Sequence, residues 1–279
     1  MPAMAGTLTL LEAILLGVVQ GLTEWLPVSS SGHLVLAKHF LGIEAPLFFD
    51  LALHFGTLVV VLYFFRATVL EAAAALVAIP RDYTRSRSWR TVLEHPERRL
   101  ALLVVLGSIP TAVIGFTFRA QFEALHDSAF LVGCVLLFTG TYLFLTRFAP
   151  TPRPGEGQLR WPHALLMGTC QGLALIPGLS RSGSTISSAL FCGVDRETAV
   201  RFSFLLSVPA ILGAIVFEAD GAALGDAAAH LPVYLAGIAT SMAVGYAALA
   251  ALVFIVKKRA FHHFAWYCWA VGLLTLALL

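Results

Sequence analysis

Long apolar segments dominate the chain and determine its predicted architecture. Six are long enough to cross a bilayer, at residues 47–65, 100–118, 129–148, 199–217, 232–256 and 264–279. A bilayer core about 30 Å thick needs a helix of roughly 20 apolar residues. The pattern allows the first helix to continue to residue 79, and Trp266, Tyr267 and Trp269 supply interface anchors for the short last one. We predict an all-α integral membrane protein with about six transmembrane helices.

Two further apolar regions, about 8–42 and 162–193, are interrupted near their middles by Pro, Gly and Ser. Such breaks are tolerated at membrane depth only where the freed backbone groups face protein or a watery cavity. Neither region has the pattern of one continuous span. We predict that each is a re-entrant helical hairpin that returns to the side from which it enters.

The two broken regions resemble each other. Aligned without gaps, residues 17–42 and 168–193 are identical at nine of 26 positions, including the pattern QGL followed by SxSG in both copies. Three predicted spans separate the copies, so the second copy enters the membrane upside down. Inverted repeats of this kind build many transporters. We therefore predict a single membrane domain over 1–279, with a first repeat at about 8–148 and an inverted second repeat at about 162–279.

The loop charges orient the predicted bundle. Residues 80–99 hold six arginines, residues 257–259 are Lys-Lys-Arg, and the connection 149–161 contributes Arg153 and Arg160. The loop 218–231 has acidic residues, Asp220 among them, and no basic residue. The positive-inside rule places the basic loops in the cytoplasm and the acidic loop outside. The first hairpin then enters from outside and the second from the cytoplasm.

Composition excludes several classes of protein. Of the 279 residues, 58% are hydrophobic and 12% are charged, with a net charge of +2 and a mean hydropathy of +0.84. A soluble domain is typically about 25% charged, so a soluble enzyme, a disordered chain and a nucleic-acid binder are excluded. The four cysteines form no CxxC pair and predict buried free thiols rather than disulfides or a zinc site.

The break in the first hairpin is rich in polar residues. Gln20 and Glu24 lie one helical turn apart, Pro27 ends that half-helix, and Ser29, Ser30 and Ser31 come before His33. The serines suit the N-terminus of a second half-helix, where unpaired N–H groups attract an anion. Ionisable groups within a membrane are functional hypotheses by default.

The break in the second hairpin contains one arginine, Arg181, flanked by Ser180, Ser182 and Thr185. An unpaired guanidinium at membrane depth is costly, so it needs an anionic partner. Its planar fork matches phosphate, and the hydroxyl groups can complete a phosphate cradle. A structural ion pair with Glu24 across the repeats is the alternative, and it is compatible with a catalytic role.

The motifs QGLTEWLPVSSSGH at 20–33 and PGLSRSGST at 177–185 resemble those of the undecaprenyl-pyrophosphate phosphatase family, also called the bacitracin-resistance protein family. The resemblance covers essentially the whole chain. It implies a bacterial inner-membrane hydrolase that converts undecaprenyl diphosphate to undecaprenyl phosphate, the lipid carrier of cell-wall synthesis. Because the first hairpin is predicted to enter from outside, we expect the site to open to the periplasm. The family's functional positions fall on Gln20, Glu24, Ser30, His33, Ser180, Arg181 and Thr185.

The resemblance also implies a divalent cation, Mg²⁺ or Ca²⁺, with Gln20 and Glu24 as candidate ligands. Because Gln20 is uncharged, such a site has one carboxylate fewer than in many relatives. The nucleophile stays open: Ser30 attacks with His33 as its base, which we favour, or His33 attacks directly, or an activated water attacks without a covalent intermediate. Asp50 and His54 either line the same cavity or form a hydrogen-bonded pair within the bundle.

A transporter or flippase for a polyprenyl phosphate is the competing function, because inverted repeats and an arginine-centred anion site suit alternating access equally well. An enzyme needs reactive groups beside the phosphate, whereas a carrier needs only the anion cradle. The sequence leaves the oligomeric state open, a homodimer included.

Overall fold

A computed structural model describes residues 8–125, 128–152, 157–218 and 221–279. The described residues are mostly helical and contain no β-strand. Arg153 and Asp220, which contribute to the loop charges that predict the orientation, lie outside the described residues. The α-helices are α1 (Leu10–Trp25), α2 (Ser30–Leu41), α3 (Leu47–Phe64), α4 (Arg66–Ser86), α5 (Trp89–Leu93), α6 (Pro96–Thr117), α7 (Arg119–Leu125), α8 (Ala129–Leu145), α9 (Trp161–Leu173), α10 (Arg181–Phe191), α11 (Arg196–Glu218), α12 (Gly221–Ala229), α13 (Leu231–Lys257) and α14 (Phe264–Leu278).

The predicted spans are confirmed. Six helical segments in the described residues are long and apolar enough to cross a membrane: Leu47–Phe64, Pro96–Thr117, Ala129–Phe148, Arg196–Phe217, Leu231–Lys257 and Phe261–Leu278. The first span does not continue unbroken to residue 79, because α3 ends at Phe64 and α4 begins at Arg66. The Arg66 side chain folds back on the preceding turn, where its guanidinium lies 5.0 Å from the centre of the Tyr63 ring.

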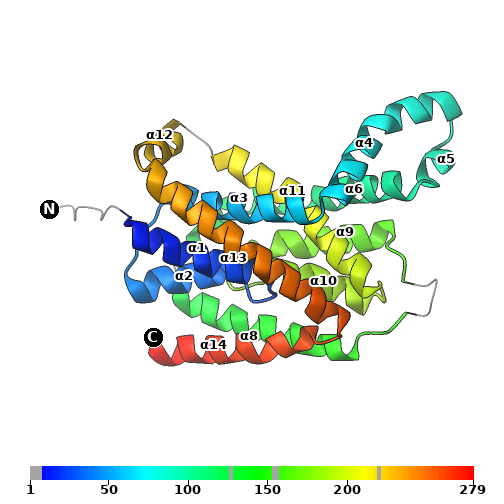
Figure 1. The fold of residues 1–279 in the computed structure, drawn as a ribbon. Helices are drawn as coiled ribbons and strands as arrows, with labels where there is room; N and C mark the ends of the chain where they lie inside the picture. The colour runs from blue at the N-terminus through cyan, green and yellow to red at the C-terminus, as the bar shows by residue number, and fades with distance from the viewer. Residues whose placement is uncertain (1–7, 126–127, 153–156, 219–220) are drawn as a thin grey trace.

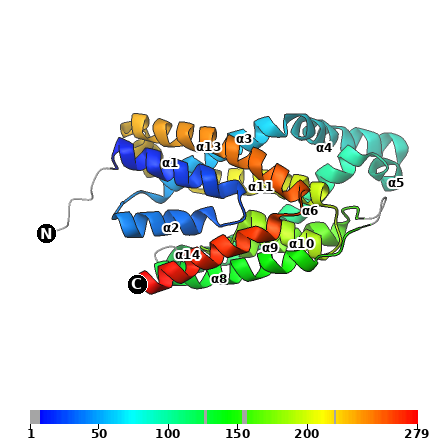
Figure 2. The same cartoon turned by 60° about the horizontal axis from the view of Figure 1, so that its bottom comes forward.

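The two broken regions form helical hairpins that enter the bundle from opposite ends. Figure 1 shows α1 and α2 extending inward from the end that carries the N-terminus and α12, whereas α9 and α10 extend inward from the end that carries α4 and α5. The turned view gives the same arrangement (Figure 2). This geometry is compatible with a pair of re-entrant hairpins.

The two hairpin turns touch inside the bundle. The Ser29 hydroxyl accepts a hydrogen bond from the Gly178 backbone N–H at 3.1 Å, and the Ser182 hydroxyl donates to the Leu26 carbonyl at 3.3 Å. No larger residue fits at Gly32, because an added Cβ atom would lie 2.9 Å from the Gly178 Cα. The breaks in sequence are therefore the points at which the two halves meet.

Each hairpin packs closely against a span from the other half of the chain. Helix α1 lies on α13, and an added Cβ atom at Gly17 would lie 2.7 Å from the Gly237 carbonyl oxygen. Helix α9 lies on α6 in the same manner, and an added Cβ atom at Gly172 would lie 2.8 Å from Ile114 Cδ1. Small residues allow such close approach between membrane helices. Helices α8 and α14 also pair, and this set of pairings is compatible with an inverted repeat.

Candidate active site

The two half-helices that follow the breaks begin with the same serine cap. Ser29 Oγ accepts a hydrogen bond from the Gly32 N–H at 3.3 Å, and Ser180 Oγ accepts one from the Gly183 N–H at 3.0 Å. Ser29 has a φ of 70°, a left-handed conformation that is uncommon outside glycine. Strain of this kind concentrates at functional sites. The caps place the N-termini of α2 and α10 beside the contact between the hairpins.

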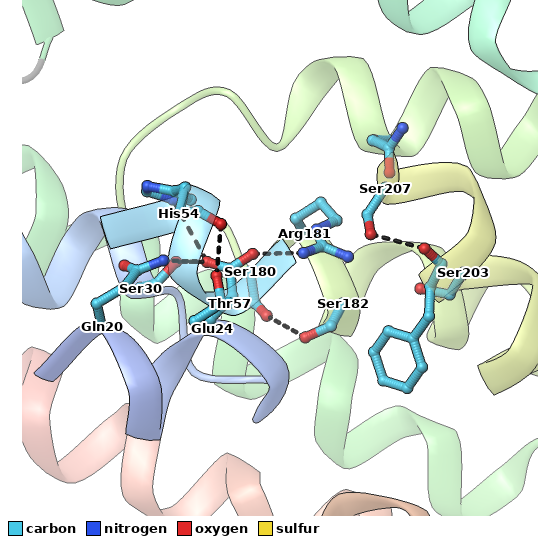
Figure 3. Close-up of polar contacts among 12 residues, drawn as sticks. Gln20, Glu24, Ser30, His54, Thr57, Ser180, Arg181, Ser182, Ser203 and Ser207 are labelled. Atoms are coloured by element: carbon cyan, nitrogen blue, oxygen red, sulfur yellow. Dashed lines mark hydrogen bonds and ion pairs between the residues drawn. The ribbon is translucent and has the colours of Figure 1, made fainter. Parts of the chain in front are cut away.

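Glu24, only 6% exposed, is the centre of the polar cluster. Its Oε2 atom accepts hydrogen bonds from Gln20 Nε2 at 2.9 Å and from Ser30 Oγ at 2.6 Å. The same oxygen lies 3.4 Å from His54 Nε2, and Oε1 forms an ion pair with Arg181 Nη2. Figure 3 shows these side chains converging from both hairpins and from α3.

Arg181 uses only part of its guanidinium in the ion pair with Glu24. The guanidinium carbon lies 5.3 Å from the centre of the Trp25 ring, which orients the group by a cation–π contact. The second terminal nitrogen, Nη1, is buried without a hydrogen-bond partner within the described part of the chain. A buried donor without a partner is costly, and a phosphate oxygen would satisfy it.

These groups form the polar wall of a cavity of about 580 Å³. Glu24, Ser30, Arg181, Asp50 and His54 all line it, and most of the remaining lining is apolar. A binding site for an amphiphile needs this combination, because a charged group and an apolar group must enter the same space.

The predicted site residues divide into two sets. Those that line the cavity are Glu24, Ser29, Ser30, Ser31, Ser180 and Arg181. Those that do not line it are Gln20, His33, Ser182 and Thr185. Thr185 is fully buried and its hydroxyl lies 2.6 Å from that of Ser203, while Ser182 binds the Leu26 carbonyl. Both hydroxyl groups therefore connect elements of the fold in this structure.

The structure does not bring His33 to the Ser30 hydroxyl. The Nδ1 atom of His33 lies 2.7 Å from the Ser29 carbonyl oxygen, and Nε2 lies 2.9 Å from the Tyr267 hydroxyl on α14. The imidazole also stacks on the Tyr267 ring, at 5.6 Å between centroids. Both ring nitrogens are thus occupied, and the group that hydrogen-bonds the Ser30 hydroxyl is Glu24.

His54 lies beside Glu24, and its role was one of the points that the sequence analysis did not decide. Asp50 and His54 both line the cavity, and the hydrogen bond between them joins His54 Nδ1 to the Asp50 backbone carbonyl at 2.8 Å. The Asp50 carboxylate instead pairs with Lys38 at 2.5 Å. The sequence signal for these two residues was their spacing, because Asp50 and His54 lie one helical turn apart on an otherwise apolar span. It did not show that His54 Nε2 faces the carboxylate of another helix.

The donor set limits how a divalent cation can bind. The described residues contain no group of three or more His, Cys, Asp or Glu side chains arranged to hold a metal ion. Gln20 presents its amide nitrogen, not its oxygen, to Glu24 (Figure 3). Mg²⁺ is commonly bound by one or two carboxylates together with substrate phosphates. The Glu24 carboxylate therefore fits a cation that is also held by phosphate oxygens.

A six-span bundle whose hairpins enclose a buried carboxylate, serine and arginine defines a membrane protein with an intramembrane polar site. The family model for the bacitracin resistance protein BacA matches residues 13–274, and the chain belongs to this family. It is 48% identical to the undecaprenyl-diphosphatase of Desulfatibacillum aliphaticivorans, over 94% of this chain and 96% of that protein. It is 45% identical to the undecaprenyl-diphosphatase of Desulforapulum autotrophicum, over 96% and 97% of the two chains. The undecaprenyl-diphosphatase of Methanosphaera stadtmanae is 40% identical, over 97% and 98%.

Substitution Arg181→Lys tests whether Arg181 binds phosphate. Lysine keeps the charge that pairs with Glu24 but loses the planar fork that matches phosphate. We expect kcat for diphosphate hydrolysis to fall by about 100-fold, or about 2.7 kcal/mol of transition-state stabilisation. Thermal unfolding in detergent should be nearly unchanged. Near-normal turnover would show that Arg181 serves only the ion pair.

Proposed function

We propose that this chain is a membrane phosphatase that hydrolyses undecaprenyl diphosphate to undecaprenyl phosphate and inorganic phosphate. The observation that carries the proposal is the hydrogen bond from the Ser30 hydroxyl to the Glu24 carboxylate, 2.6 Å long, on a cavity wall shared with Arg181. The names of the relatives and the largely apolar cavity support a polyprenyl diphosphate as the substrate. The product is the lipid carrier that cell-wall synthesis reuses.

Substrate binding uses the positive end of each half-helix. The terminal phosphate binds the Arg181 guanidinium, including the buried Nη1 that lacks a partner in the described structure. The first turns of α2 and α10 add backbone N–H groups and the positive ends of their helix dipoles. Ser31 and Ser180 line the same cavity and donate further hydrogen bonds to phosphate oxygens.

The hydrolysis proceeds in two steps. In the first, Ser30 Oγ attacks the terminal phosphorus while its proton passes to Glu24, the bond to the bridging oxygen breaks, and undecaprenyl phosphate leaves with the proton that Glu24 returns to it. In the second, Glu24 accepts a proton from a water molecule that attacks the phosphoserine, the bond between phosphorus and Ser30 Oγ breaks, Glu24 gives the proton back to Ser30, and inorganic phosphate is released. Arg181 neutralises the charge that builds on the phosphoryl oxygens in both steps. His54, on α3, contacts Glu24 and holds its carboxylate in position.

Glu24 and the substrate's phosphate oxygens are the groups that would hold a divalent cation. Glu24 would hold it, with Gln20 able to contribute only after its amide rotates, and the diphosphate would supply the other ligands. When bound, the ion adds positive charge next to the phosphoryl oxygens. The protein groups above supply the nucleophile, the base and the guanidinium.

The cavity opens toward the periplasm in the proposed orientation. Its outer lining comes from Leu47 at the start of α3, Phe116 near the end of α6 and Phe217 near the end of α11. These ends lie on the side of α12, opposite the arginine-rich segment that includes α5. The positive-inside rule assigns the arginine-rich side to the cytoplasm, and the family resemblance supports the bacterial inner membrane as the location.

Phosphate release in detergent tests the proposed function. Purified protein should release inorganic phosphate from undecaprenyl diphosphate without any membrane gradient, and Ser30→Ala should abolish the release, since no other hydroxyl group within the described residues bonds to Glu24. Ser184→Ala is the matched control, because Ser184 is also on a half-helix but does not line the cavity. Binding of the lipid without release of phosphate would favour the carrier.

Trapping the intermediate identifies the nucleophile. Rapid quenching with labelled substrate should capture an acid-stable, base-labile phosphoserine that is lost in Ser30→Ala and retained in His33→Ala. Phosphohistidine has the opposite stability. An acid-labile adduct that disappears in His33→Ala would contradict the assignment to Ser30, and absence of any adduct would indicate direct attack by water.

Cysteine labelling tests the orientation. In a variant without the four native cysteines, Arg90→Cys in α5 should be shielded from impermeant thiol reagents in intact cells. Ala228→Cys in α12 should react, because the acidic loop is predicted to face outward. Labelling of both positions after the cells are permeabilised is the control. Reaction of the α5 cysteine in intact cells would reverse the proposed orientation.

A further inference from the structure

Basic residues gather at the end of the bundle that carries α4 and α5, where α8 ends and the chain turns from α13 into α14 (Figure 1). Two short 3₁₀-helices, η1 (Thr146–Phe148) after α8 and η2 (Phe261–His263) before α14, pack against each other there. The basic residues on these two elements and beside them are Arg147, Arg196, Arg259, His262 and His263. We call these five residues the basic cluster.

The fold holds the members of the basic cluster close together. The rings of His262 and His263 lie 4.2 Å apart between centroids. Arg147 and Arg196 both interact electrostatically with His262, and Arg259 does so with Arg196. The cluster therefore combines the end of α8, the start of α11 and the turn between α13 and α14, which are distant in sequence.

The arginines of the basic cluster have no carboxylate partner. None of the three forms an ion pair with a residue that the structure describes. The two acidic residues beside Arg196 in sequence are engaged elsewhere, since Glu197 pairs with Lys257 at 3.6 Å and the Asp195 carboxylate accepts a hydrogen bond from the Thr198 N–H at 3.0 Å. Positive charges that lie close together repel one another. An anion bound between them would remove this repulsion.

The basic cluster lies at the ends of two membrane spans. The candidate span Ala129–Phe148 ends with η1, and the candidate span Phe261–Leu278 begins with η2. The side chains of Phe148 and Trp266 on these spans are 68% and 60% exposed. The guanidinium of Arg147 lies 5.1 Å from the centre of the Phe148 ring. A molecule bound at the cluster can therefore contact charged groups and apolar rings together.

We propose that the basic cluster binds the phosphate of an anionic phospholipid, whose acyl chains lie along α8 and α14. The planar guanidinium of arginine matches phosphate with two parallel hydrogen bonds, and basic pockets between membrane helices suit anionic head groups. The exposed aromatic rings favour a lipid over a soluble anion, because acyl chains would cover them. This site goes beyond the proposed hydrolysis, since none of the five residues lines the cavity of Glu24 and Arg181.

Native mass spectrometry of the full chain in detergent tests the proposal. Dioleoyl phosphatidylglycerol should bind more tightly than dioleoyl phosphatidylcholine, which has the same acyl chains and no net charge. The triple variant Arg147→Gln, Arg196→Gln, Arg259→Gln should weaken the first binding of phosphatidylglycerol by about 100-fold, since each arginine beside a head group contributes about fivefold. Equal affinity of the unmodified chain for the two lipids would overturn the proposal.

A matched control removes the same charge from the same end of the bundle. The triple variant Arg81→Gln, Arg85→Gln, Arg87→Gln changes three exposed side chains at and after the end of α4. It should leave the first binding of phosphatidylglycerol unchanged. Equal weakening by the two triple variants would show a diffuse attraction rather than a site, and would overturn the proposal.

Two further measurements keep the test decisive. Arg147→Gln alone changes one exposed side chain, so it tests the site even if the triple variant fails to fold. It should weaken phosphatidylglycerol binding about fivefold, and an unchanged affinity would overturn the proposal. Millimolar inorganic phosphate should not displace the lipid. Displacement would indicate a site for free phosphate and would overturn the assignment to a lipid.

Discussion

The buried ion pair between Glu24 and Arg181 is the interaction on which the arrangement of the two hairpins depends. The two residues are 157 positions apart in sequence and come from opposite breaks. A single charge buried in a membrane bundle without a partner is strongly destabilising. Neither hairpin can place its polar break in the bundle unless the other hairpin meets it. The hydrogen bond between Ser29 and Gly178 fixes the same contact through the backbone.

The ion pair also constrains the chemistry. Glu24 holds Arg181 through one oxygen and the Ser30 hydroxyl through the other, so one carboxylate positions both the proposed anion binder and the proposed nucleophile. A phosphate that binds Arg181 Nη1, which lacks a partner in the described structure, would share the guanidinium with Glu24. In the proposed reaction Glu24 Oε2 stays directed at the Ser30 hydroxyl and takes its proton. The stability of the empty site and the activation of the nucleophile thus depend on the same group.

Most of the fold and part of the site were predictable from sequence. The spans followed from the length of apolar segments, and the ion pair between the two breaks was the alternative to phosphate binding that the cost of an unpaired arginine left open. The orientation of His33 was not predictable, because its spacing from Ser30 places both on one turn but does not identify the neighbouring helix. Tyr267 occupies that neighbouring position in the structure. The contact of His54 with Glu24 likewise depends on how α3 packs against α1, which no local pattern encodes.

The repeat gives a reason for the position of His33. At the offset of 151 residues that aligns the hairpins, Ser30 corresponds to Arg181 and His33 corresponds to Ser184. Ser184 Oγ lies 3.2 Å from the hydroxyl of Tyr142 on α8, as His33 Nε2 lies beside the hydroxyl of Tyr267 on α14. Each half-helix is thus connected to a tyrosine on one of the paired helices α8 and α14. The first positions of the two half-helices differ, with the hydroxyl of Ser30 in one and the guanidinium of Arg181 in the other. Two similar half-helices with these different first residues can bring the proposed nucleophile and the proposed anion-binding group to the same phosphate.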